Sequence, residues 1–238
     1  MHFIKLSFCP MLFGLFGSNS IPSSWQLFPQ KFKKGDPNNF GGKIILPQIV
    51  IEDLVAAQIT PPYTFELSHS GGEFKSCCGV IEFTSNMDTV ILPSWLYHQL
   101  NITDLTVLTV KYKIFCKGTF VRFLPHSTSF LEIESPKSEL ENSLRNYQVL
   151  TIGDEIYCNF EEHEPIRFTV TEMDRGLSSI YIVDTDLSVD FLPPLGYEEK
   201  VEREKSAKRF IERIKKDGEE YDVVKMKENG LYFGIYNK

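Results

Sequence analysis

The chain has 238 residues, of which 42% are hydrophobic and 24% are charged, and its formal net charge is −7. These fractions match ordinary globular proteins and disfavour a disordered, collagenous or membrane-embedded chain, and no apolar run is long enough for a transmembrane helix. The negative charge disfavours nucleic-acid binding through the phosphates.

Charge is distributed unevenly along the chain. Residues 1–35 contain four lysines and no acidic residue, whereas residues 120–196 contain fourteen acids against five bases, which gives −9. The first seventeen residues are mostly apolar and are interrupted by Pro10. Two interpretations of the N-terminal segment stay open, a poorly ordered end and a targeting segment that resembles a transit peptide.

Residues 25–114 have a mainly β pattern. Apolar alternation predicts short strands at 43–47, 63–67, 78–83, 90–92 and 107–114. Short helices are predicted at 49–57 and 94–100, the second with Ser94 as a candidate N-cap. Many short strands separated by glycine and proline turns indicate a barrel or a sandwich.

From residue 119 the pattern becomes mixed α and β. Ser135 and Pro136 are a strong helix start, and the helix is predicted to run to about residue 146. Strands are predicted at 151–160, 166–172 and 180–183, with a hairpin turn at 161–165. A charged helix at 198–216 and a small hairpin of 221–226 and 231–236 follow.

The five cysteines are odd in number and form no C-x-x-C pair, which argues against a disulfide framework and a zinc ribbon. They are Cys9, Cys77, Cys78, Cys116 and Cys158. Neighbouring strand residues point to opposite faces, so one thiol of the pair Cys77 and Cys78 is predicted to be buried and the other exposed.

Sequence motifs for catalysis are missing: there is no zinc-protease helix, nucleophile elbow, phosphate loop or dinucleotide fingerprint. His163 lies among three glutamates, where a solvated loop is favoured over a metal site. Asp184, Asp186 and Asp190 form either an acidic solvent face or a contact for a basic partner. We therefore predict no catalytic residue, no cofactor and no metal.

Several spaced blocks of sequence resemble one known family. They are Gly41-Gly-Lys-Ile-Ile-Leu-Pro47, Ile51-Glu-Asp-Leu54, Cys78-Gly-Val-Ile-Glu-Phe83, Leu92-Pro-Ser-Trp95, Phe130-Leu-Glu-Ile133, Pro136-Lys137, Leu140-Glu-Asn-Ser-Leu-Arg-Asn-Tyr147, Leu150-Thr-Ile-Gly-Asp154, Val189-Asp-Phe191 and Pro194-Leu-Gly-Tyr197. In this order they resemble the N-terminal domain of the ubiquitin fusion degradation protein 1 family, and a short or organelle-specific member is one form that the resemblance leaves open.

The resemblance implies a mainly β fold with an α+β part. It implies a double-psi β-barrel subdomain at 22–118 and a smaller α+β subdomain at 119–196, preceded by an extension at 1–21 and followed by a helical and hairpin tail at 197–238. It also implies a non-enzymatic adaptor that binds ubiquitin and polyubiquitin chains. With a homologue of nuclear protein localization protein 4, such an adaptor recruits ubiquitylated proteins to a homologue of the AAA ATPase valosin-containing protein, for extraction and proteasomal degradation.

The implied location is the cytoplasm, at the ER surface or in the nucleus; a plastid-associated import machinery is the alternative. A ubiquitin-independent module for unfolded chains is a rival function. The chain ends 42 residues after Gly196 without a clear Phe-x-Gly-x-Gly motif, which argues against direct binding of the ATPase through such a motif. The tail is expected to bind the partner, because it carries apolar residues on a helix and a hairpin. These are Phe210, Ile211, Ile214, Tyr232 and Phe233.

The sequence does not indicate which residues contact ubiquitin. We expect exposed apolar side chains ringed by polar ones, either on the barrel or in a groove between the two halves. Because a small domain binds ubiquitin weakly, several contacts along a chain are expected to add up.

Overall fold

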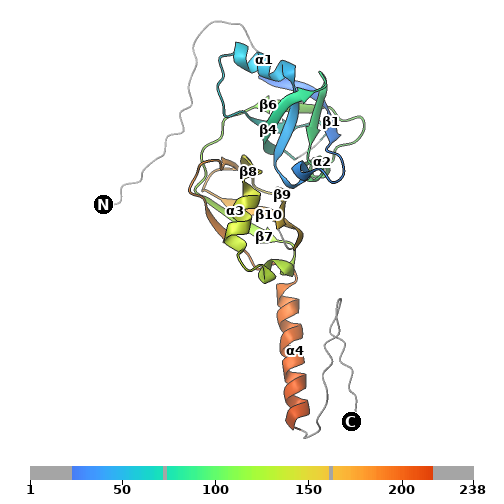
Figure 1. Cartoon of the computed structure of the whole chain (residues 1–238), viewed down its shortest axis with the longest axis vertical. Coiled ribbons are helices and arrows are strands. Elements are labelled where there is room, and N and C mark those ends of the chain that lie inside the picture. The colour runs from blue at the N-terminus through green and yellow to red at the C-terminus, as the bar shows by residue number, and fades with distance from the viewer. Residues whose placement is uncertain (1–22, 72–73, 161–162, 217–238) are drawn as a thin grey trace, which may run out of the picture. The chain divides into compact units, whose positions relative to one another are not determined.

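The computed structural model describes residues 23–71, 74–160 and 163–216. The chain divides into two compact units, the first of which ends at Leu195. The second unit contributes one described element, the helix α4 (Tyr197–Lys216), which confirms the predicted charged helix. Figure 1 shows the elements of the first unit, coloured from blue to yellow and brown.

The first half of the first unit is a closed barrel with strand order β1-β5-β2-β4-β3-β6. Its strands are β1 (Ser24–Lys31), β2 (Lys43–Pro47), β3 (Thr64–Ser68), β4 (Ser76–Ser85), β5 (Thr89–Leu92) and β6 (Leu108–Tyr112). The pairing is mixed: β1 is parallel to β5 and antiparallel to β6, and β2 is parallel to β4. The β-rich first half is confirmed, and the double-psi connectivity stays a prediction.

A proline stands immediately before each of the two helices of the barrel half, where a strand has just ended. The helices are α1 (Gln48–Ala56), after Pro47, and α2 (Ser94–Gln99), after Pro93. The fixed φ of proline suits the extended residue before a helix. Ser94 is therefore the first helical residue and not the N-cap, and its N and Oγ both donate to Oδ1 of Asn39, at 3.0 and 2.8 Å. A short 3-10 helix, η1 (Pro37–Phe40), presents Asn39.

The second half contains a four-stranded sheet of order β12-β7-β10-β9 and a two-stranded sheet of β11 and β8. Its strands are β7 (Phe120–Pro125), β8 (Val149–Thr151), β9 (Glu155–Phe160), β10 (His163–Met173), β11 (Ser179–Tyr181) and β12 (Ser188–Phe191). The helices are η2 (Thr128–Glu132) and α3 (Pro136–Leu144), and α3 begins with Pro136 as predicted. The α+β character of this half is confirmed.

Two predicted boundaries in this half are wrong. The strand predicted at 151–160 is two strands, because Gly153 has a φ of +87° and turns the chain between β8 and β9. The turn predicted at 161–165 ends earlier, since β10 already begins at His163. Pro165 lies inside a register shift of the β9–β10 pair, where a residue without an N–H is tolerated.

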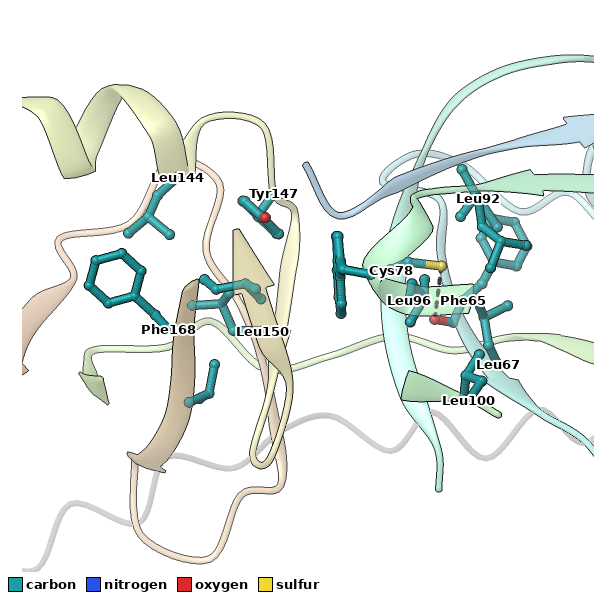
Figure 2. Packing of buried hydrophobic residues seen from close by; sticks show 14 of the residues in the cluster. Phe65, Leu67, Cys78, Leu92, Leu96, Leu100, Leu144, Tyr147, Leu150 and Phe168 are labelled. Atoms are coloured by element: carbon teal, nitrogen blue, oxygen red, sulfur yellow. Dashed lines mark hydrogen bonds between the residues drawn. The ribbon is translucent and has the colours of Figure 1, made fainter. Parts of the chain in front are cut away.

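Buried hydrophobic side chains of both halves form one continuous cluster. Figure 2 shows Phe65, Leu67, Leu92, Leu96 and Leu100 on the barrel side and Leu144, Tyr147, Leu150 and Phe168 on the other. Leu140 and Leu144, four residues apart on α3, are both buried, as their spacing predicts. The two halves therefore share a core within one compact unit.

Close backbone approach joins the halves. A Cβ atom at Gly42 would overlap the ring of Tyr147, and one at Gly79 would overlap the side chain of Gln148. The space is used for hydrogen bonds across the junction: Gly42 N donates to Asn146 O at 3.2 Å, and Val80 N to Oε1 of Gln148 at 3.1 Å. Gly42 and Gly79, which both belong to the family blocks, are thus packing positions at the junction.

The outer edge of β9 is closed by side chains. The amide groups of Glu155, Tyr157 and Asn159 donate to Gln99 Oε1, Tyr147 Oη and Ser143 Oγ, at 2.8, 3.2 and 3.1 Å. The Tyr147 hydroxyl also donates to Tyr157 O at 2.7 Å. This arrangement satisfies an edge strand that otherwise would offer a template for pairing with another chain.

Candidate binding site

A groove lies where the barrel meets the second half, and it encloses about 280 Å³. Its lining is mostly apolar and comes from the approach to β3, the segment after β6 and the end of β11. The lining residues are Pro62, Thr64, Ile114, Phe115, Lys117, Tyr181, Val183 and Asp184. Ile114 is 73% exposed, so its side chain offers apolar surface at the groove.

Backbone hydrogen bonds hold the two walls of the groove together. Tyr181 N donates to Cys116 O and Gly118 N donates to Tyr181 O, both at 2.9 Å. The Lys117 ammonium donates to Asp184 O at 2.9 Å. Burial, and then the nearby Asp184 carboxylate, raise the pKa of Tyr181, so its hydroxyl stays neutral. The groove is therefore apolar at its lining, with one lysine and one aspartate at its rim.

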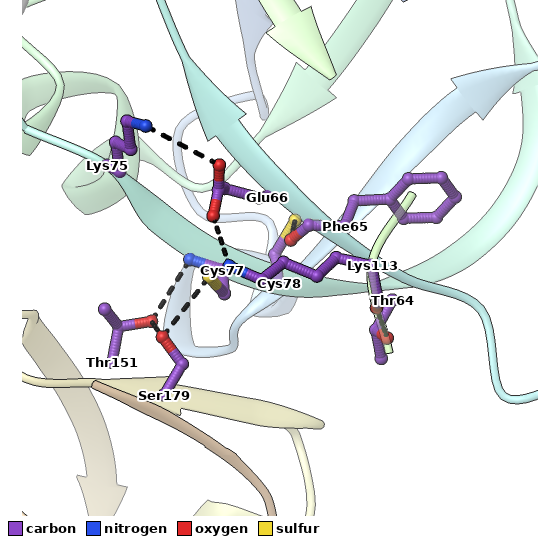
Figure 3. A network of polar contacts seen from close by, with 9 residues as sticks. All are labelled: Thr64, Phe65, Glu66, Lys75, Cys77, Cys78, Lys113, Thr151 and Ser179. Carbon is purple, nitrogen blue, oxygen red and sulfur yellow. Dashed lines mark hydrogen bonds and ion pairs between the residues drawn. The ribbon is translucent and has the colours of Figure 1, made fainter. Parts of the chain in front are cut away.

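A polar network supports the barrel wall of the groove (Figure 3). Lys113 Nζ donates to Glu66 Oε2 at 2.6 Å, and the same ammonium lies 5.4 Å from the centre of the Phe115 ring. The bond from Lys113 lowers the pKa of Glu66, which keeps that carboxylate charged. The Thr64 hydroxyl donates to Lys113 O at 2.5 Å. These contacts fix the strand that leads into Ile114.

The same figure shows how Cys77 joins the barrel to the second half. Its N–H donates to Thr151 Oγ1 at 3.2 Å, and its Sγ lies 3.4 Å from Ser179 Oγ. Both Cys77 and Cys78 are buried, so the prediction of one exposed thiol is wrong. One face of this strand packs in the barrel and the other is covered by the second half.

Burial raises the pKa of both thiols and of Cys158, the last to about 12. A thiol is a poor nucleophile when it is protonated, so these three cysteines are structural. None of the four cysteines in the described residues takes part in a disulfide, and Cys9 lies outside them. Within the same residues, no three histidine, cysteine or acidic side chains are arranged to hold a metal ion.

A second apolar surface lies on the outer face of the barrel, on neighbouring strands. Phe28, 50% exposed, follows the residue Leu27 that pairs with Leu108. Met87 lies near Phe28, because Phe28 N donates to Asp88 O at 2.7 Å. Val107 also flanks Phe28, because it precedes Leu108, the partner of Leu27. The nearby turn of residues 103–106 exposes Leu105 by 92%. We call Phe28, Met87, Leu105 and Val107 the barrel patch.

The acidic residues of the second half mostly bond within the protein. Asp190 accepts from Arg122 Nε at 2.8 Å, and this bond lowers its pKa. Asp174 accepts from the N–H groups of Thr119 and Phe120, at 2.7 and 3.2 Å. Asp186 is exposed and Asp184 lies at the groove rim. Asp190 is therefore accounted for by its bond with Arg122, and it does not require a basic partner protein.

The predicted partner-binding residues lie outside the described part. The backbone of α4 includes positions 210, 211 and 214, but the side chains of Phe210, Ile211 and Ile214 are outside the description, as are Tyr232 and Phe233. The sequence does not single out the groove residues; it predicts exposed apolar side chains either on the barrel or in a groove between the halves. The sequence signal for the groove is weak and consists of two adjacent apolar residues, Ile114 and Phe115, near the end of a predicted strand.

Comparison with known proteins identifies the chain. The fold to be compared is a β-barrel joined through a shared core to an α+β half, with an apolar groove at the junction. The model described as "Ubiquitin fusion degradation protein UFD1, N-terminal subdomain 1" matches residues 21–115, and that of "N-terminal subdomain 2" matches 117–194. The chain therefore belongs to the ubiquitin fusion degradation protein 1 family.

Curated relatives agree. The chain is 33% identical over 185 residues to "Ubiquitin fusion degradation protein 1 homolog" of Dictyostelium discoideum, over 77% of this chain and 56% of that protein. It is 36% identical over 160 residues to "Ubiquitin recognition factor in ER-associated degradation protein 1" of Homo sapiens, over 67% and 51%. It is 35% identical over 172 residues to "Ubiquitin fusion degradation protein 1" of Schizosaccharomyces pombe, and the match covers 71% of this chain and 50% of that protein. The chain thus spans about half the length of these relatives.

None of the helices in the described ranges combines the length and apolarity needed to cross a bilayer.

Proposed function

We propose that this chain is a non-enzymatic, ubiquitin-binding adaptor that acts in ubiquitin-dependent and ER-associated protein degradation. The observation that carries the proposal is the match of both halves to the two N-terminal subdomain models of one family. The human relative is named as a ubiquitin recognition factor in ER-associated degradation, which supports ubiquitin as the ligand and a role in degradation at the ER.

We propose that the groove is the ubiquitin contact. Its apolar lining suits one or two apolar side chains of a partner surface, and Ile114 offers area that binding would remove from water. Lys117 and Asp184 at the rim can orient the partner through charge. A groove of about 280 Å³ provides a small contact, so affinity for one ubiquitin is expected to be weak and to rise with chain length.

The test is the same substitution at two exposed apolar residues, one in the groove and one in the barrel patch. We expect Ile114→Glu to weaken binding to a lysine-48-linked ubiquitin chain at least fivefold, because a charge would enter the apolar groove. Leu105→Glu changes an even more exposed residue of the barrel patch and is expected to leave binding unchanged. NMR titration of the full-length chain and both variants with monomer and chain measures this.

Other results have clear meanings. If Leu105→Glu weakens binding and Ile114→Glu does not, the barrel patch is the contact and the groove assignment is wrong. If the wild type binds neither monomer nor chain, the ubiquitin-binding function itself is wrong. Binding of unmodified, unfolded protein in the same titration would favour the rival, ubiquitin-independent module.

We also propose that 197–238 binds the partner that links the adaptor to the ATPase, a homologue of nuclear protein localization protein 4 acting with a valosin-containing protein homologue. The support is the charged α4 together with the apolar positions Phe210, Ile211, Ile214, Tyr232 and Phe233. Deletion of 198–238 is expected to abolish capture of the purified partner while ubiquitin binding is kept. Capture that survives the deletion contradicts this assignment.

A further inference from the structure

A carboxyl group is buried where the two halves meet. Asp154, between β8 and β9, is 1% exposed. The barrel contributes two donors to it: Ser76 Oγ on β4 donates to Oδ2 at 2.8 Å, and Gln99 Nε2 at the end of α2 donates to Oδ1 at 2.7 Å. The Thr151 hydroxyl of the second half adds a third bond. The carboxyl group therefore bonds to both halves at once.

The described partners of Asp154 are all neutral donors. Burial without a compensating cation disfavours the charged form, and it raises the pKa of Asp154 to about 7, against the opposing effect of the three hydrogen bonds. Both the acid and the carboxylate are thus populated at neutral pH.

The surrounding hydrogen bonds restrict where the proton of the acid form can point. Gln99 cannot turn its amide, because its Oε1 already accepts from Glu155 N at 2.8 Å. Thr151 Oγ1 already accepts from Cys77 N and from Ser179 Oγ, each at 3.2 Å, which fills its two acceptor positions. The Ser76 hydroxyl is the partner that can reverse and accept.

Thr151 connects this carboxyl group to the groove. It pairs with Ser179 in the β8–β11 ladder, and Tyr181, two residues further along β11, forms a wall of the groove. We propose that Asp154 is a proton-sensitive tie between the barrel and the second half, and that a change in its protonation state shifts the β11 wall of the groove. The shift itself does not depend on the ligand; only its effect on binding rests on the proposed ubiquitin site.

Other titratable and charged groups lie on the elements around Asp154. Burial raises the pKa of Cys77, Cys78 and Tyr147, so all three stay protonated. On the neighbouring strands, Glu155 forms an ion pair with Arg167 at 2.8 Å. Burial lowers the pKa of His126, and the charges of Arg167 and Glu155 also act on its ring.

The experiment is an NMR pH titration of the full-length, isotope-labelled chain without ligand, between pH 5 and pH 8. We expect the side-chain carboxyl carbon of Asp154 and the amides of Thr151, Ser179 and Tyr181 to share one midpoint near pH 7. In Asp154→Asn these amides should not move through that midpoint. Glu155→Gln, which neutralises the adjacent exposed carboxylate, should titrate like the wild type.

The tie is wrong if the Asp154 carbon titrates below pH 5, if the Tyr181 amide stays still while it titrates, or if that amide moves equally in Asp154→Asn. The wild-type titration decides by itself if Asp154→Asn does not fold. Because no ubiquitin is present, this result is separate from success or failure of the ubiquitin-binding proposal.

Discussion

Replacing Gly42 by alanine is expected to lower the free energy of unfolding by about 3 kcal/mol, the upper part of the range for overpacking a core. The added Cβ would overlap the ring of Tyr147, which is 1% exposed. The Tyr147 hydroxyl donates to Tyr157 O and accepts from Tyr157 N, which fixes the ring in place. The ring cannot retreat without losing these bonds and reopening the edge of β9. Urea unfolding of the purified variant measures the loss.

Gly71→Ala is the matched control. Its new Cβ would meet only the His69 ring, at 3.6 Å, and its φ is not in the left-handed region. We expect a change within about 0.5 kcal/mol, which is typical of surface positions. Equal stability of the two variants would contradict the view that close approach at Gly42 holds the halves together.

Local pattern predicted most of the elements because each is encoded by a few adjacent residues. Pro136 at the start of α3 and the apolar pair Leu140 and Leu144 are examples, and both are confirmed. β1 was missed because Pro29 interrupts its alternation, although Trp25 and Leu27 point into the barrel as a period of two requires.

The junction could not be predicted in the same way, because its contacts join residues far apart in the chain. The period of two predicts that one thiol of the pair Cys77 and Cys78 is exposed. Both are buried, because both faces of their strand are covered and the alternation of buried and exposed residues does not apply there. Pro62, Ile114 and Tyr181 are unremarkable in sequence and become a groove only through the bridge between Lys117 and Tyr181. Asp154 stood inside a family block without any sign that it would be buried.

Packing and electrostatics therefore meet at one place. The family blocks contribute Gly42, Gly79 and Tyr147 to the close packing at the junction. They also contribute Asp154, a buried carboxyl group that accepts hydrogen bonds from Ser76 and Gln99 of the barrel. A buried polar group of this kind favours one arrangement of the halves because any other leaves Ser76 and Gln99 without a partner.

Asp154→Ala is expected to cost about 3 kcal/mol at pH 6, since it leaves the Ser76 and Gln99 donors buried without their acceptor and opens a small cavity. Asp154→Asn keeps the size and an acceptor for Gln99 and is expected to fold. The informative quantity is the difference in free energy of unfolding between wild type and Asp154→Asn, measured by urea unfolding at each pH.

The sign of that difference follows from the raised pKa. The native state holds the Asp154 proton up to about pH 7, whereas the unfolded chain releases it near the ordinary value of 3.8. The contribution is therefore complete below pH 3.8 and is lost as the pH rises through 7. The difference should fall by about 1.4 kcal/mol per pH unit between pH 5 and pH 6.5 and level off above about pH 7.5.

Other groups cancel in this difference, because Glu66, Asp174 and Asp190, whose pKa values are lowered, and His126 are present in both proteins. A difference that stays constant from pH 5 to pH 8 would mean that Asp154 is charged throughout this range. The lowering of the Asp154 pKa by its three hydrogen-bond donors would then outweigh the raising by burial, and the junction would not respond to pH in this range.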